Sequence, residues 1–252
     1  NMFKEKNYVV IKNAISKDKA DFLFRYFKLK REVAKTMFAR KWLSPYSTEW
    51  GQWNCPQIPN TYVMYGDVAF DCLLEELRSV VSKYTELDLV EQYSFARLYK
   101  KGDELKRHKD RYSCEISTTL NLGGDLWPIF IEPDSTKGIK DPNGYKSEFT
   151  KGVQIDLEPG DMVVYNGVDL EHWREPFDGE ICGQVFFHYN TSAHAQEHDN
   201  RYDGRPHLGL PDNFVNKRLY KFPDGKVKEL DNEELKKIRH DDNKRQMEAN
   251  KK

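Results

Sequence analysis

The sequence predicts an α+β, mostly β fold, in which a β-sandwich carries helices on one outer face. Three observations lead to this prediction. Two stretches near the N-terminus have apolar residues at helical spacing, and the region 93–190 alternates short β-rich runs with turn signals. No internal repeat is evident, which argues against a solenoid or a propeller. Helices that precede a run of short strands are typical of helices packed on a sheet.

Two helices are expected before the strands. Ser16 is a typical N-cap, and the residues after it place Ala20, Leu23, Phe24 and Phe27 at helical spacing. Asp67 opens the clearer helix, whose apolar face comprises Phe70, Leu73, Leu74, Leu77, Val80, Val81 and Tyr84. A short strand is expected at 8–12. The Pro-, Trp- and Asn-rich stretch 42–66 is interpreted as an ordered loop.

The β-rich region predicts six strands, bounded by turns that contain Gly, Pro, Asn or Asp. The expected strands are 93–100, 115–122, 128–132, 152–157, 161–166 and 183–190. Beyond residue 190 the chain becomes polar, with a possible hairpin at 220–230 and a charged helix at 231–252. We therefore expect one domain over 1–190 and a polar C-terminal extension over 191–252.

Composition excludes several classes of protein. Among 252 residues, 40 are basic and 41 acidic, giving a net charge of −1, so neither nucleic acid nor an anionic membrane is an expected partner. No run approaches the roughly 20 apolar residues that span a bilayer, and the first residues lack the apolar core of a signal peptide. The four cysteines are scattered and form no C-x-x-C pair, which fits a reducing compartment. A cytoplasmic location is the expectation.

A candidate metal site begins at His108 and Asp110. In an extended chain these two side chains project to the same side, because successive residues alternate faces. The sequence could instead form a solvated polar turn, since basic residues flank the pair. His172 follows the predicted strand 161–166, far enough along the chain for the sheet to return to the same place. Two imidazoles and one carboxylate on one side of a metal form the facial triad of non-haem Fe(II) oxygenases.

The order of these residues resembles the Fe(II)/2-oxoglutarate-dependent dioxygenases, and most of all their prolyl 4-hydroxylase-like branch. The matching features are Tyr99, the short turn at 101–103, the H-x-D of His108 and Asp110, an E-P-G-D turn at 158–161, and the late His172. The resemblance extends over roughly residues 8–190.

This resemblance implies a double-stranded β-helix, or jelly roll. It also implies Fe(II) held by the three ligands, with 2-oxoglutarate and O2 as cosubstrates and ascorbate as a possible addition. Tyr99 matches the family tyrosine whose hydroxyl meets the cosubstrate, and Thr119 matches a position that commonly faces it; either residue could instead be structural. The implied reaction hydroxylates an unactivated C–H bond and releases succinate and CO2. A prolyl residue of a peptide or protein is the favoured substrate, with free amino acids or another protein side chain as the other options.

The sequence departs from the family pattern at the residue that anchors 2-oxoglutarate. Related enzymes usually place a basic residue about ten positions after the late histidine. Here that position is Cys182, and residues 175–200 contain no Lys or Arg. Arg174 is the expected substitute, because it shares a face with His172 in an extended segment and its fork suits a carboxylate. The alternatives are an ion pair of Arg174 with Glu171 or Glu175, and Arg97 as the anchor.

Two rival functions remain open from the residues alone. One is a cupin-like metal enzyme of another type, such as an isomerase, which needs no anchor for 2-oxoglutarate. The other is a catalytically silent jelly-roll module that binds a ligand without turnover.

Overall fold

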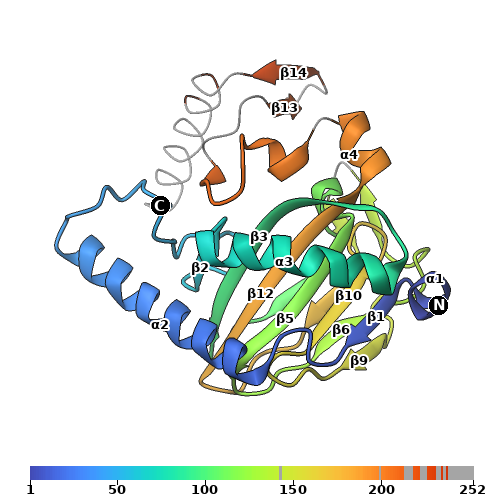
Figure 1. Ribbon diagram of the computed structural model, residues 1–252, viewed down its shortest axis with the longest axis horizontal. Helices are drawn as coiled ribbons and strands as arrows, with labels where there is room; N and C mark the ends of the chain where they lie inside the picture. Colours follow the sequence, from blue (N-terminus) through green and yellow to red (C-terminus); the bar gives the residue numbers. More distant parts are fainter. Residues whose placement is uncertain are drawn as a thin grey trace.

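The computed structural model describes residues 1–141, 144–198 and 200–212, together with the strands at 218–221 and 227–230 and positions 226, 234 and 237. Two antiparallel sheets face each other, and helices cover the outer face of the larger sheet (Figure 1). The structure therefore has the predicted sandwich of sheets with helices on one outer face, and the sheets do not close into a barrel.

The larger sheet has six strands in the order β1-β10-β5-β12-β3-β2. Their bounds are β1 Tyr8–Ile11, β2 Tyr62–Tyr65, β3 Leu89–Lys100, β5 Ile116–Gly124, β10 Met162–Asn166 and β12 Ile181–Thr191. The smaller sheet has the order β4-β11-β6-β9, with β4 Leu105–His108, β6 Ile129–Ile131, β9 Val153–Ile155 and β11 His172–Arg174. Two hairpins complete the described strands: β7 Ile139–Asp141 with β8 Gly144–Lys146, and β13 Arg218–Lys221 with β14 Val227–Leu230.

Both predicted N-terminal helices are present. The helix α2 runs over Lys17–Ala39, and the hydroxyl of Ser16 accepts a hydrogen bond from the Lys19 amide at 3.1 Å. The helix α3 runs over Val68–Thr85, and the carboxylate of Asp67 accepts from the amides of its first turn. Tyr84 was expected on the buried face but is 41% exposed. Two shorter helices are α1 Met2–Lys6 and α4 Ser192–His198.

Five of the described strands escaped the sequence prediction, namely β2, β4, β7, β8 and β11. The stretch 42–66 was interpreted as loop throughout, but Tyr62–Tyr65 pairs with β3 at the edge of the larger sheet. The strands β4 and β11 have four and three residues and are polar or charged. Runs so short carry no periodicity that a sequence could display.

Apolar side chains pack on both faces of the larger sheet, in separate clusters. On its outer face, side chains of α2 and α3 pack against the sheet in one large cluster that includes Phe27, Phe70, Leu74, Leu120 and Phe187. Between the two sheets lie two smaller apolar clusters, and polar groups interrupt the space between them. The interior between the sheets is therefore where buried polar side chains meet.

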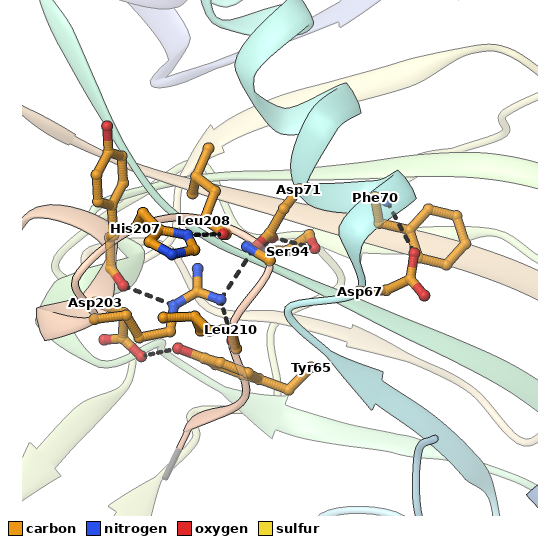
Figure 2. A network of polar contacts seen from close by, with 12 residues as sticks. Tyr65, Asp67, Phe70, Asp71, Ser94, Asp203, His207, Leu208 and Leu210 are labelled. Carbon is orange, nitrogen blue, oxygen red and sulfur yellow. Dashed lines mark hydrogen bonds and ion pairs between the residues drawn. The ribbon is translucent and has the colours of Figure 1, made fainter. Parts of the chain in front are cut away.

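The chain beyond β12 returns to pack on the core. The Arg205 guanidinium is fully buried and forms an ion pair with Asp71 of α3 at 3.0 Å. Nearby, the Tyr65 hydroxyl donates to Asp203 at 2.6 Å (Figure 2). The domain boundary at residue 190 stays a prediction, and these contacts show that residues after it pack on α3 and β2. The predicted hairpin corresponds to the paired β13 and β14, whereas the predicted helix 231–252 lies almost entirely outside the described residues.

The Arg205–Asp71 pair leads to a stability prediction. Removing one partner of a buried ion pair leaves the other charge uncompensated and costs about 3–5 kcal/mol. We expect Arg205→Ala to lower the free energy of unfolding in urea by that amount. The control is Arg25→Ala, because Arg25 is 73% exposed and lies 3.9 Å from Asp21; its loss should cost less than about 1 kcal/mol. Equal effects of the two substitutions would contradict the prediction.

The described cysteines are all free, as expected. In the part of the chain that the structure describes, none of the helices has the length and apolar character that crossing a membrane requires.

Candidate metal centre and cosubstrate pocket

The structure brings His108, Asp110 and His172 together. His108 is the last residue of β4 and lies directly opposite His172, the first residue of β11. Asp110 follows two residues after β4, and its Oδ1 lies 3.5 Å from the Nε2 of His108 and 3.4 Å from that of His172. One ligand atom from each of the three residues lies within 4.8 Å of the others. This spacing suits three ligands of a single metal ion.

The backbone fixes which nitrogen of each imidazole faces this point. The Nδ1 of His108 lies 2.7 Å from the Lys106 carbonyl oxygen, and the Nδ1 of His172 lies 2.9 Å from the Leu170 carbonyl oxygen. A nitrogen that faces a carbonyl oxygen carries the hydrogen, so in the neutral ring, which is the form that binds a metal, the lone pair is on Nε2. Metal-binding histidines are commonly oriented in this way by a partner on their other nitrogen.

Ser117 and Gly167 position Asp110. The Ser117 hydroxyl donates to the Asp110 Oδ2 at 2.7 Å, and the Asp110 backbone amide donates to the Gly167 carbonyl at 2.8 Å. A Cβ on Gly167 would lie only 2.5 Å from the same Oδ2. Position 167 therefore needs to lack a side chain for Asp110 to take this position.

Electrostatics keep this carboxylate ionised. Burial alone would raise the pKa of Asp110, but the imidazoles of His172 and His108 outweigh burial and hold this pKa well below its ordinary value. Burial lowers the pKa of His172, yet the Asp110 carboxylate outweighs it and leaves that pKa raised. For the nearby His188 the balance is reversed: burial outweighs the attraction of the Asp110 carboxylate and lowers the pKa of His188 to about 4. An ionised carboxylate is the form that binds a metal.

A cavity of about 340 Å³ opens onto these three residues between the two sheets. Its wall on the larger sheet comes mainly from alternate residues of β3, namely Tyr93, Phe95, Arg97 and Tyr99. The remainder is largely apolar or aromatic and includes Leu105, Ile129, Tyr165 and Phe186. A concave, mostly apolar site with a few convergent polar groups is typical of small-molecule binding.

The residues predicted to bind the cosubstrate differ in their relation to this cavity. Tyr99 lines it, whereas Arg174 and Thr119 are not among its lining residues. The guanidinium of Arg174 donates to the Thr119 hydroxyl at 3.4 Å and to the Trp127 carbonyl oxygen. The Tyr99 ring packs edge-on against Trp127 with centroids 4.8 Å apart. Two of these buried groups, the Arg174 Nε and the Tyr99 hydroxyl, have no hydrogen-bond partner among the described residues.

The alternative ion pair of Arg174 with a neighbouring carboxylate is wrong. Glu171 pairs with Arg107 at 2.9 Å, and Glu175 accepts from the Trp173 indole at 3.0 Å. Among the residues that the structure describes, no carboxylate lies within ion-pair distance of Arg174, although its side chain is only 1% exposed.

Sequence reasoning missed three supporting residues. Ser117 had a usable signal, since it lies two positions before Thr119 on the same face of β5. Gly167 and Gln57 had none, because they lie outside regular strands. The amide of Gln57 nevertheless lies 3.3 Å from the His108 Nε2. Trp42, Trp50, Trp53 and Trp127 are not among the lining residues of the cavity.

Known structures share the fold of this chain, although its sequence matches no known family. No protein-family model and no curated protein matches the sequence. Among solved structures, AviO1 from Streptomyces viridochromogenes Tue57 matches at 16% identity over 76% of this chain and 92% of that chain, with a TM-score of 0.52. HygX from Streptomyces hygroscopicus, with nickel and 2-oxoglutarate bound, matches at 13% identity over 76% and 85%, with a TM-score of 0.51.

A prolyl-4-hydroxylase from Pseudomonas putida also matches, at 16% identity over 76% of this chain and 96% of that one. Its TM-score of 0.46 supports no inference about the substrate. The chain therefore shares the fold of these structures, and the jelly roll that the resemblance implied is confirmed.

Proposed function

We propose that this protein is an Fe(II)/2-oxoglutarate-dependent dioxygenase that hydroxylates an unactivated C–H bond. The observation that carries the proposal is the ligand set: two imidazoles with Nε2 turned inward and one ionised carboxylate, all at the wall of one apolar cavity. This donor set suits Fe(II) and leaves three coordination positions open. The nickel and 2-oxoglutarate bound to the similar fold of HygX support the proposal.

Each predicted site residue has a role in this proposal. His108, Asp110 and His172 would hold the iron. When bound, the iron supplies the chemistry that couples decarboxylation of 2-oxoglutarate, to succinate and CO2, with oxygen insertion into a C–H bond; ascorbate would help to keep it ferrous. The Tyr99 hydroxyl donates to the cosubstrate, and Thr119 orients the guanidinium that grips it. The protein's contribution is positioning and the exclusion of water from the cavity.

Arg174 is the proposed anchor for the far carboxylate of 2-oxoglutarate. A fully buried guanidinium without a carboxylate partner is costly, and an incoming carboxylate removes that cost. Two residues of extended strand separate Arg174 from His172, a distance of about 6.6 Å, which is of the order of the length of a five-carbon diacid. Its unpartnered Nε and the unpartnered Tyr99 hydroxyl are donors that a carboxylate would satisfy.

The finer proposal concerns the substrate. The sequence resemblance to the prolyl 4-hydroxylase-like branch favours a prolyl residue of a peptide or protein, with free amino acids or another protein side chain as the other options. The cavity is apolar enough to accept a pyrrolidine ring beside the metal.

The deciding experiment measures succinate formed from 2-oxoglutarate by the Fe(II)-loaded protein, with and without proline-containing peptides and free proline. We expect metal-dependent succinate formation that a substrate stimulates and that chelation abolishes. Metal binding with no consumption of 2-oxoglutarate would instead favour a cupin-like enzyme of another type. Absence of both metal binding and turnover would favour a silent binding module.

A further inference from the structure

Arg97 is a second buried cation at the cavity, distinct from Arg174. It lies on β3 of the larger sheet, is only 2% exposed and lines the cavity. Its guanidinium packs over the rings of Phe95 and Tyr99, with 5.1 Å and 5.6 Å to the ring centroids. Arg174 lies on β11 of the smaller sheet and packs over Trp127 instead. The two guanidinium groups therefore approach the site from opposite sheets.

The present partners of Arg97 are neutral. Its Nη2 donates to the Gln57 amide oxygen at 2.8 Å and to the Cys55 sulfur at 3.4 Å, while its buried Nε has no partner. Over the described ranges, no carboxylate forms an ion pair with it. The remaining basic residues of the cavity wall differ: Arg111 is paired with Asp203 at 2.8 Å, and Lys109 donates to backbone carbonyls. Arg97 is thus the buried cation of the wall that lacks an anion.

The Gln57 amide shows how near this cation lies to the metal ligands. Its oxygen accepts from Arg97, and its nitrogen lies 3.3 Å from the His108 Nε2. One carboxamide therefore spans the space between the guanidinium and a ligand atom. A substrate oxygen that replaced the Gln57 oxygen would be bound to Arg97 and would hold its neighbouring carbons beside the metal.

The charges of the proposed complex leave Arg97 uncompensated. The two charges of Fe(II) and the charge of Arg174 are balanced by Asp110 and the two carboxylates of 2-oxoglutarate. Asp110 is the only carboxylate among the described residues that line the cavity, so nothing in the wall balances Arg97. A planar guanidinium binds a carboxylate through two parallel hydrogen bonds, which is the strongest complement available to it.

The size and lining of the cavity restrict the rest of the ligand. Its volume of about 340 Å³ is near the lower end of the range for small-molecule sites, and 2-oxoglutarate must share it. Phe95 and Phe186 supply apolar surface beside Arg97. The space that remains suits a small acid with an apolar body.

We propose that Arg97 binds the carboxylate of the substrate, and that the substrate is a small organic acid of amino-acid size rather than an internal residue of a polypeptide. This inference rests on the proposed function, because it places 2-oxoglutarate on Arg174 and the metal. The substrate carboxylate would accept from Arg97 after displacing the Gln57 oxygen. The carbon to be hydroxylated would then lie within a few bonds of that carboxylate.

Binding of matched probes to the Zn(II)-loaded protein with saturating 2-oxoglutarate tests the inference by calorimetry. The probes are N-acetyl-L-proline and its neutral counterpart N-acetyl-L-prolinamide. We expect the acid to bind at least tenfold more tightly than the amide, and Arg97→Gln to remove that preference while Arg97→Lys keeps part of it. Equal binding of acid and amide, no binding of the acid at millimolar concentration, or an unchanged preference in Arg97→Gln would each overturn the inference.

A second pair of variants leaves Arg97 in place. Cys55→Asp puts a carboxylate next to the guanidinium, whereas Cys55→Asn adds a neutral group of the same shape. We expect Cys55→Asp to weaken binding of N-acetyl-L-proline at least tenfold relative to Cys55→Asn, because the new carboxylate competes for Arg97. Equal binding by the two variants would count against the inference even if Arg97→Gln fails to fold.

Binding of 2-oxoglutarate separates this inference from the proposed function. Metal-dependent binding of 2-oxoglutarate should survive in Arg97→Gln. If Arg97→Gln loses it, Arg97 is the cosubstrate anchor, and the inference fails while the proposed function stands. A wild-type protein that does not bind 2-oxoglutarate in the presence of metal would contradict the proposed function itself.

Discussion

His108→Ala, Asp110→Ala and His172→Ala should each reduce succinate formation more than 100-fold and weaken metal binding by a comparable factor. Losing a residue that merely orients a ligand typically costs 10–100-fold in metal affinity or activity, so losing a ligand itself should exceed that range. The fold should survive, because the His108 and Asp110 side chains are 22% and 15% exposed at the cavity wall. His172 is 3% exposed, so its replacement should lower the melting temperature the most. Metal content, succinate formation and circular dichroism of each variant provide the measurements.

Two controls define the scale of this prediction. His207 is exposed and lies outside the cavity lining, so His207→Ala should leave metal affinity and turnover unchanged. Ser117→Ala removes the hydroxyl that donates to Asp110. Its effect should lie between those of His207→Ala and the ligand variants, with a 10–100-fold loss of metal affinity. A ligand variant that retains wild-type metal affinity and activity would show that its residue is not a ligand.

The fold could be predicted where periodicity is long enough to be visible. The capping residues Ser16 and Asp67 and the helical spacing after each gave both long helices, because local hydrogen bonds and one apolar face determine them. Long strands such as β12 were found for the same reason. The strands β4 and β11 could not be found in this way, since three or four residues show no alternation and their pairing depends on contacts distant in sequence.

The part of the candidate site that could be predicted is the part that strand geometry determines. Alternation along an extended chain placed His108 and Asp110 on one side, and the structure brings their side chains together with His172. What surrounds them depends on tertiary packing. The partners of Arg97 come from an irregular segment, and Gly167 is needed only because Asp110 approaches it so closely. Neither relation leaves a periodic or motif signal in the sequence.

Arg174→Ala should raise the KM for 2-oxoglutarate more than tenfold while metal affinity hardly changes. Truncating one partner of a buried charge pair costs on the order of 2–5 kcal/mol, and the Arg174 side chain is 1% exposed with an unpartnered Nε. In the proposed complex the guanidinium contacts the cosubstrate already in the ground state, so its loss should act mainly on KM and the dissociation constant of 2-oxoglutarate. Arg174→Lys should rescue only part of the loss, because an ammonium keeps the charge without the planar fork.

The matched comparison is Arg97→Ala, which removes the other buried guanidinium of the site. Its dissociation constant for 2-oxoglutarate should stay within about twofold of the wild type, measured by calorimetry on the metal-loaded protein. Arg174 also contacts Thr119 and the Trp127 carbonyl, so part of any loss in Arg174→Ala could come from disturbed packing. Partial recovery in Arg174→Lys, with an unchanged melting temperature, separates charge from packing. If Arg97→Ala raises the dissociation constant and Arg174→Ala does not, the anchor lies on β3 of the larger sheet instead.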